Sequence, residues 1–113
     1  MPPFYESCYK VLKKVPKGKV TTYCEIARAL NSKAYRAVGS AMHNNPYSPI
    51  VPCHRVVNSN GNIGGFYSGA KCKIKMLKKE GVEVKNNKID LNKYFFKLKW
   101  PQKLNAYKKK MKN

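Results

Sequence analysis

The chain is 113 residues long and 42% hydrophobic, which is enough for one folded domain with a modest core and too little for two. Its 24 lysines and arginines against 5 acidic residues give a net charge of +19, which favours a polyanionic partner, nucleic acid first and a membrane surface second. No apolar run approaches the roughly 18 residues of a membrane span, and the N-terminal residues lack the basic-then-apolar layout of a secretion signal. We therefore expect a cytoplasmic protein that does not enter a membrane.

The cysteines do not predict a disulfide framework or a metal site. No two of them form a Cys-x-x-Cys pair, and a cytosolic setting keeps thiols reduced. The spacing of the histidines and cysteines does not support a zinc site that uses His43 or His54. We expect no metal and no cofactor, and we expect three of the four cysteines to be small core residues. The four are Cys8, Cys24, Cys53 and Cys72.

Two helices are predicted in the first 30 residues. Apolar residues at helical spacing predict an amphipathic helix between Phe4 and Val15, and Pro16-Lys17-Gly18 ends it. After a short extended piece, Thr22-Tyr23-Cys24-Glu25 matches a capping box, in which the Thr hydroxyl accepts from the third backbone N–H and the Glu reaches back. The second helix follows, and its inward residues are Ile26, Ala27 and Leu30.

A third helix is predicted from Lys33 to His43, close behind the second. Asn31 can end the second helix in the left-handed region and Ser32 can cap the third, which gives the outline of a helix-turn-helix. The third helix is slim and carries one long cation, Arg36. A slim helix can approach either the core or DNA, and its composition alone leaves both open. Its small residues are Ala34, Ala37, Gly39, Ser40 and Ala41.

A proline-framed segment, residues 49–57, follows the turn at Asn44-Asn45-Pro46. Each proline fixes its own φ and biases the preceding residue away from helix, so we expect the segment to be extended. It places Cys53 directly beside His54 and Arg55. The cysteine is either a buried residue of a β-segment or a reactive thiol flanked by two potential cations.

After the proline-framed segment, residues that favour turns alternate with short apolar runs. Residues 58–62 predict a hairpin turn between Val56-Val57 and Ile63. The glycine-rich loop at residues 64–69 carries two aromatics, which either cap the core or form a pocket wall that stacks a flat ligand. It lacks the spacing of a phosphate-binding fingerprint.

A further helix follows, with an apolar face at Ala70, Ile74 and Leu77 and a lysine face, and Gly81 ends it. A small β-hairpin is predicted around Asn86-Asn87. An aromatic cluster is expected to pack back onto the body before a frayed basic tail. The predicted lysine face consists of Lys71, Lys73, Lys75, Lys78 and Lys79, and the cluster consists of Tyr94, Phe95, Phe96, Leu98 and Trp100.

Three motifs in order give the chain a family resemblance. Arg36-Ala37-Val38-Gly39, then Asn45-Pro46, then Pro52-Cys53-His54-Arg55-Val56 resemble the signature of the O6-alkylguanine-DNA alkyltransferases, the methylated-DNA–protein-cysteine methyltransferases. The resemblance covers about residues 4–100. It implies a mainly α fold with a small β component, a winged helix-turn-helix-like catalytic domain at residues 1–101, a basic tail at 102–113, and a monomer.

The resemblance implies that Cys53 accepts the alkyl group. Only a thiolate is a competent nucleophile, and a free thiol with a pKa of about 8.5 is mostly protonated at neutral pH. By the family pattern His54 takes the proton through a bound water and is oriented by Glu80. Tyr23 donates a proton to the departing guanine, and Asn45 braces the active-site turn.

The implied partner is double-stranded DNA that contains O6-alkylguanine. The nucleotide must leave the base stack to reach a thiol in a protein cleft, and Arg36 resembles the finger that fills the vacated space from the minor groove. The other DNA-contacting residues that the resemblance implies are Tyr23, Tyr35, Ala37, Gly39 and Ser40. The residues implied for the base pocket are Met42, Val56, Phe66, Tyr67, Ser68 and Lys73.

Three departures from the family pattern and two rival functions remain at this stage. Ser68 stands at a usually glycine position, and the chain begins where the family's catalytic domain would begin, without the usual N-terminal domain. The lysine tail is extra charge, which we expect to add nonspecific DNA affinity that falls with salt. An alkyltransferase-like protein would recognise damage without accepting the alkyl group, although such relatives usually carry Trp at the position of Cys53. The more distant rival is a winged-helix DNA-binding regulator in which Cys53 and His54 are structural.

Overall fold

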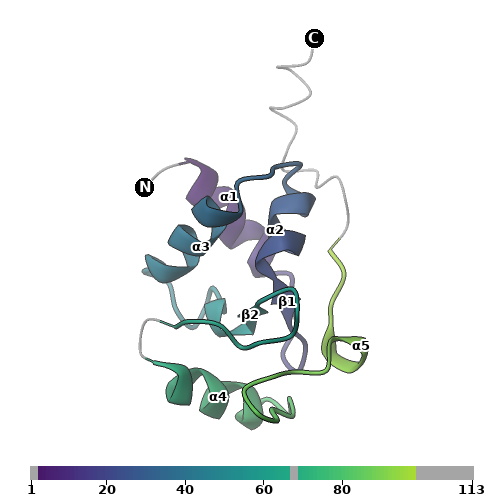
Figure 1. Ribbon diagram of the computed structural model, residues 1–113. Coiled ribbons are helices and arrows are strands. Elements are labelled where there is room, and N and C mark those ends of the chain that lie inside the picture. The colour runs from purple at the N-terminus through teal and green to yellow at the C-terminus, as the bar shows by residue number, and fades with distance from the viewer. Residues whose placement is uncertain (1–2, 67–68, 99–113) are drawn as a thin grey trace.

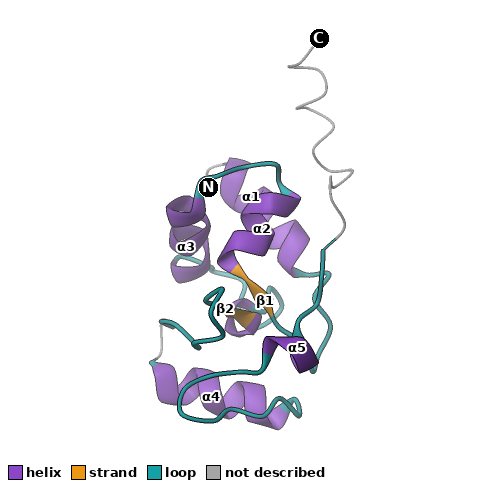
Figure 2. Cartoon of the chain, turned by 45° about the vertical axis from the view of Figure 1, so that its right-hand side comes forward, coloured by secondary structure: helices purple, strands orange, loops and turns teal. Residues whose placement is uncertain are grey.

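Three helices pack together at one end of the computed structural model and a fourth lies at the other end, with two short strands between them (Figures 1 and 2). The structure describes residues 3–66 and 69–98. The strands pair in parallel, with Thr21 opposite Val56. The predicted class, mainly α with a small β component, is confirmed. The elements are α1 (Pro3–Leu12), β1 (Thr21–Thr22), α2 (Tyr23–Ala29), α3 (Tyr35–His43), the 3₁₀ turn η1 (Cys53–Arg55), β2 (Val56–Val57), α4 (Ala70–Lys79) and α5 (Leu91–Tyr94).

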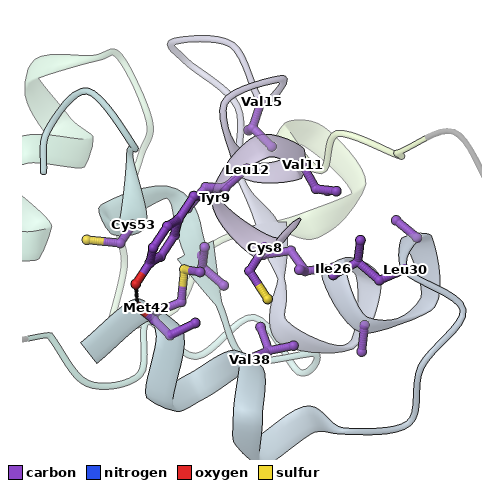
Figure 3. Packing of buried hydrophobic residues seen from close by; sticks show 14 of the residues in the cluster. Cys8, Tyr9, Val11, Leu12, Val15, Ile26, Leu30, Val38, Met42 and Cys53 are labelled. Atoms are coloured by element: carbon purple, nitrogen blue, oxygen red, sulfur yellow. Dashed lines mark hydrogen bonds between the residues drawn. The ribbon is translucent and has the colours of Figure 1, made fainter. Parts of the chain in front are cut away.

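The first helix forms as predicted and supplies one side of the core. It ends at Leu12, but Val15 is still buried after the helical turn ends. The hydroxyl of Tyr9 donates a hydrogen bond of 2.8 Å to the carbonyl of Ala41, which ties α1 to α3 (Figure 3). Burial raises the pKa of the Cys8 thiol to about 12, so Cys8 remains a neutral core residue. Cys24 is exposed and Cys72 is only partly buried, so the expectation of three cysteines as core residues is wrong.

The capping box at the start of α2 is half correct. The Thr22 hydroxyl accepts from the backbone N–H of Glu25 at 3.0 Å, as predicted. The Glu25 carboxylate, however, accepts from Arg28 and from the backbone N–H of Leu98, the latter at 2.8 Å. A buried carboxylate is stabilised more by a distant backbone N–H that has no other partner than by a local one. The hydrogen bond from Leu98 also fixes the C-terminal segment to α2.

The turn between α2 and α3 is predicted correctly at its first residue and wrongly at its second. Asn31 has a positive φ of 53°, the left-handed conformation that ends a helix. Ser32 does not cap α3, because its hydroxyl accepts from the nearer N–H of Ala34 at 3.0 Å. The helix therefore begins at Tyr35 rather than at Lys33, with Ala34 as an N-cap that has no side-chain hydrogen bond.

The proline-framed segment is not extended, which corrects the sequence-based expectation. Residues 47–50 are turns, and Cys53–Arg55 forms η1, closed by a 2.9 Å hydrogen bond from the Arg55 N–H to the Pro52 carbonyl. A proline φ suits a turn as well as a strand, and residues outside the segment decide between them. Only Val56–Val57 is extended, and it pairs with β1 instead of forming the predicted hairpin.

The C-terminal half packs as a second, smaller layer. Gly81 ends α4 with a φ of 89°, and Asn86 and Asn87 form the predicted turn with φ values of 51° and 59°. The backbones of Val20 and the C-terminal segment are joined by two hydrogen bonds, Val20 N–H to Tyr94 and Phe96 N–H to Val20. Trp100 and the predicted tail at 102–113 lie outside the described residues. This layer buries Val20, Val57, Ile63, Leu77, Val82, Ile89 and Tyr94.

None of the helices in the described ranges is long and apolar enough to cross a membrane.

Candidate active site

A cavity of about 200 Å³ opens beside Cys53, between α3, the start of α2 and the segment before α4. The cysteine is only 2% exposed. In Figure 3 it lies at the edge of the packed cluster, with its sulfur directed away from the other labelled side chains. The sulfur can therefore meet a ligand in the cavity while the rest of the residue stays in the core. The cavity is lined by Tyr23, Gly39, Met42, His43, Cys53, Gly65 and Phe66.

Asn45 holds the backbone that leads into the nucleophile's turn. Its side-chain amide donates to the Val51 carbonyl at 2.8 Å, and its side-chain oxygen accepts from the Tyr47 N–H at 2.9 Å. The N–H of Cys53 donates to the same Val51 carbonyl at 2.9 Å. One amide thus fixes two points of the chain between α3 and Cys53, which is the bracing position predicted for it.

His54 and Glu80 form a buried pair behind Cys53. The His54 ring is 2% exposed, and its Nε2 lies 3.0 Å from the Glu80 carboxylate. Arg55 donates to both oxygens of that carboxylate, at 3.0 and 2.7 Å, and also to the Val15 carbonyl at 2.9 Å. Burial alone would raise the pKa of Glu80, but these hydrogen bonds from Arg55 and His54 lower it below the ordinary value. Glu80 is therefore ionised at neutral pH.

This arrangement fixes which nitrogen of His54 carries a proton. An ionised carboxylate only accepts hydrogen bonds, so Nε2 must be the donor. Burial lowers the pKa of His54, although the Glu80 carboxylate opposes the shift, so the ring is neutral near pH 7. Its Nδ1 then bears a free lone pair, and it is buried without a hydrogen-bond partner among the described residues. A neutral imidazole with one free nitrogen can act as a base and accept a proton.

Tyr23 also lines the cavity. Burial raises the pKa of its phenol, and the nearby Cys53 adds to the shift. The hydroxyl therefore keeps its proton at neutral pH and can give it to an anion that develops in the cavity. The Thr22 cap fixes the first turn of α2, and with it the direction in which Tyr23 enters the site.

Lys73 is completely buried, which corrects its assignment to a solvated lysine face. Its ammonium donates to the Val56 carbonyl at 2.6 Å and to the Gly65 carbonyl at 3.2 Å. Burial lowers its pKa to about 8, while the nearby Cys53 opposes that shift. Val56 and Lys73 do not line the cavity themselves. Lys73 instead ties the wall residue Gly65 to β2, and it adds a cation near Cys53.

Helix α3 presents a slim surface at the mouth of the cavity. Tyr35 is 49% exposed, and Arg36 and Ser40 are exposed as well, with Ala37 partly buried. A Cβ added at Gly39 would meet no atom within 4 Å. The described residues therefore leave room for a side chain at this position, so core packing does not explain why it is glycine.

A family model described as the DNA binding domain of 6-O-methylguanine DNA methyltransferase matches residues 3–82. The chain belongs to this family. The methylated-DNA–protein-cysteine methyltransferase of Methanosarcina acetivorans is 48% identical over 79 residues, which are 69% of this chain and 51% of that protein. The chain spans about half the length of the curated methyltransferases it matches.

Two solved structures extend the likeness to this methyltransferase family. The O6-methylguanine-DNA methyltransferase of Pyrococcus kodakaraensis is 48% identical with a TM-score of 0.67, over 73% of this chain and 48% of that one. S. pombe Atl1, solved with damaged DNA containing O6-carboxymethylguanine, is 36% identical with a TM-score of 0.77, over 86% of this chain and 97% of that one. The second likeness includes residues beyond the family model, because 86% of this chain is more than residues 3–82.

For this family member the structure brings together most of the residues singled out from the sequence. Tyr23, Gly39, Met42, Cys53 and Phe66 share one cavity wall. The cysteine is flanked by the His54–Glu80 pair and braced through Asn45. Two predicted pocket residues, Tyr67 and Ser68, lie outside the described residues, so their placement stays a prediction.

The sequence did not single out His43 as a cavity residue. It lies at the last position of α3 and is exposed, yet it forms part of the wall beside Cys53. Helical spacing was the available signal, because Gly39 and His43 are four residues apart and therefore share a face. Among the described residues no cluster of three or more His, Cys, Asp or Glu could hold a metal ion, and the expectation of no cofactor remains a prediction.

Proposed function

We propose that this chain transfers an alkyl group from O6 of guanine in double-stranded DNA to its own Cys53 and is consumed by the reaction. The observation that carries the proposal is the buried thiol on a cavity, next to a neutral His54 whose Nδ1 has no partner among the described residues and whose other nitrogen is held by ionised Glu80. Together these groups are a nucleophile, a base and an orienting carboxylate.

Each proton and each electron pair in the proposed reaction has a donor and an acceptor. The thiol proton passes to Nδ1 of His54 through a water, and the Cys53 thiolate attacks the alkyl carbon. A carbon–sulfur bond forms while the carbon–O6 bond breaks, and its electron pair stays on guanine. Tyr23 supplies a proton to the guanine anion. The thioether on Cys53 has no leaving group to lose, so one molecule repairs one lesion.

DNA is the proposed partner, and α3 is the proposed contact. The relatives include a structure of the Mycobacterium tuberculosis protein OGT in complex with DNA. The open space at Gly39 and the exposed Arg36 support a close approach of α3 to the minor groove, with Arg36 filling the place of the extruded nucleotide. We propose that the protein acts as a monomer in the compartment that holds the DNA, the cytoplasm in a prokaryote.

Damage recognition without transfer is the second candidate, because the chain spans nearly the whole of Atl1. One experiment separates the two. The protein is incubated with duplex containing O6-methylguanine, and its peptides are analysed by mass spectrometry. We expect one added methylene on the Cys53 peptide in wild type and none in Cys53→Ser. Tight binding to the damaged duplex with an unmodified Cys53 would overturn the transfer proposal in favour of recognition alone.

A further inference from the structure

Helix α4 exposes a face made almost wholly of lysine. The helix buries Lys73 and Leu77 and packs Ile74 partly against the second hydrophobic cluster. Residues 71, 75 and 78 are spaced by one and two helical turns, so they lie together on the opposite side. Residue 79 lies beside them, one turn after residue 75. We call this surface the α4 lysine face; it consists of the exposed residues Lys71, Lys75, Lys78 and Lys79.

The charge of this face is not compensated within the described part of the chain. The ion pairs there join Glu25 to Arg28, Glu80 to its two partners on η1, and Glu83 to Lys85. None includes a member of the α4 lysine face. Four uncompensated cations on ten residues repel one another, and a polyanion relieves that repulsion.

The α4 lysine face points away from the helix proposed to hold the damaged duplex. In both views α4 lies at one end of the molecule, with the strands between it and α1, α2 and α3 (Figures 1 and 2). Because its buried side faces those strands, its lysine side faces outward. Helix α3 carries one cation of its own, Arg36. The four lysines of the α4 lysine face therefore lie outside the proposed contact with the first duplex.

The dimensions of the face suit a DNA backbone. From residue 71 to residue 79 a helix rises about 12 Å, and B-DNA carries one negative charge per about 1.7 Å of its axis. About seven phosphates thus lie within the length of the face, enough for each lysine to pair with one. Lysine ammonium groups contact phosphates rather than base edges, so binding would be independent of sequence.

We propose that the α4 lysine face binds the phosphate backbone of a second DNA duplex while α3 engages the first. The choice of DNA as the polyanion rests on the proposed function. Held between two segments, the protein moves from one to the other without passing through free solution, which shortens the search for rare lesions.

A capture assay with unmodified duplexes tests the proposal. One duplex is immobilised, a second is free and labelled, and the full chain is added. We expect wild type to retain the label, and the triple variant K71Q/K75Q/K78Q to retain about tenfold less, with the salt slope of capture reduced by about 2 to 3. The triple variant itself should stay on the immobilised duplex. Lys79 is left unchanged because it lines a cavity with Glu80.

A matched variant removes the same charge elsewhere. K85Q/K88Q/K97Q alters three exposed lysines of the C-terminal half, and we expect it to capture the second duplex like wild type. Failure of wild type to capture any second duplex, or equal capture by both triple variants, would overturn the proposal. Circular dichroism checks that each variant is folded. Methylation of Cys53 is measured on the same preparations, so loss of transfer with intact capture would count against the proposed function alone.

Discussion

The chemistry of the site depends on one side chain that is doubly constrained. His54 is buried, which lowers its pKa, and its Nε2 is committed to Glu80, which leaves Nδ1 as the free base. The neutral form is the active form in the proposed mechanism. The rate of transfer should therefore fall as the pH drops through the lowered pKa of His54 and the ring becomes protonated.

Glu80→Gln tests this assignment. The carboxylate raises the pKa of His54 against burial, so its removal should lower that pKa further and move the acid limb of the rate profile to lower pH. The plateau rate should fall by about 10- to 100-fold, because the amide holds the ring less firmly. The measurement is single-turnover methyl transfer as a function of pH. An acid limb at the same pH in both proteins would mean that His54 is not the group that titrates.

Gly39 is the second residue whose role can be separated from folding. A Cβ there meets no atom of the described fold within 4 Å, so Gly39→Ala should leave the melting temperature unchanged or raise it, given the low helix propensity of glycine. Binding to duplex should weaken by about tenfold or more, because the new side chain occupies the space proposed for DNA. Thermal unfolding and fluorescence anisotropy measure the two effects. Unchanged DNA affinity would place the duplex elsewhere.

At the scale of elements, helix ends that depend on neighbouring residues were mostly predicted correctly, and structure that depends on distant residues was not. Thr22 caps α2 and Asn31 and Gly81 end their helices as expected, because each bond or conformation involves residues within a few positions. The segment around Cys53 was predicted to be extended and instead forms η1. Its shape depends on Asn45 and on the pairing of β2 with β1, and no local pattern encodes that pairing.

The same distinction between local and long-range information applies to the residues of the site. Cys53, His54 and Arg55 are adjacent in the sequence, and the ordered motifs were enough to nominate Glu80, Tyr23 and Asn45 from a distance. Lys73 was placed both on a solvated face and in the base pocket, and the structure puts it in neither. Lysine is seldom fully buried, and two carbonyls far apart in sequence were needed to hold it.

On the scale of the whole molecule, the C-terminal segment is bound to the domain by a buried carboxylate. Glu25 accepts from the Leu98 N–H and from Arg28, whose side chain is half exposed. Glu25→Ala should lower the free energy of unfolding by about 1–3 kcal/mol, because it leaves a buried N–H without a partner. Arg28→Ala, the matched control, removes the half-exposed partner of the ion pair and keeps the Leu98 bond, so it should cost less than about 1 kcal/mol. Urea unfolding gives both values, and equal losses would show that the Leu98 bond contributes little.

The strand that precedes Tyr23 is bonded along both edges. On one side β1 pairs with β2, which follows the η1 turn that contains Cys53, and on the other Val20 pairs with Phe95. The family model ends at residue 82, so part of what holds β1, and with it the proposed proton donor, comes from outside the region that the model matches. For protein engineering, a chain trimmed to residues 3–82 would therefore keep every reactive group of the proposed site and lose the edge that Val20 forms with Phe95.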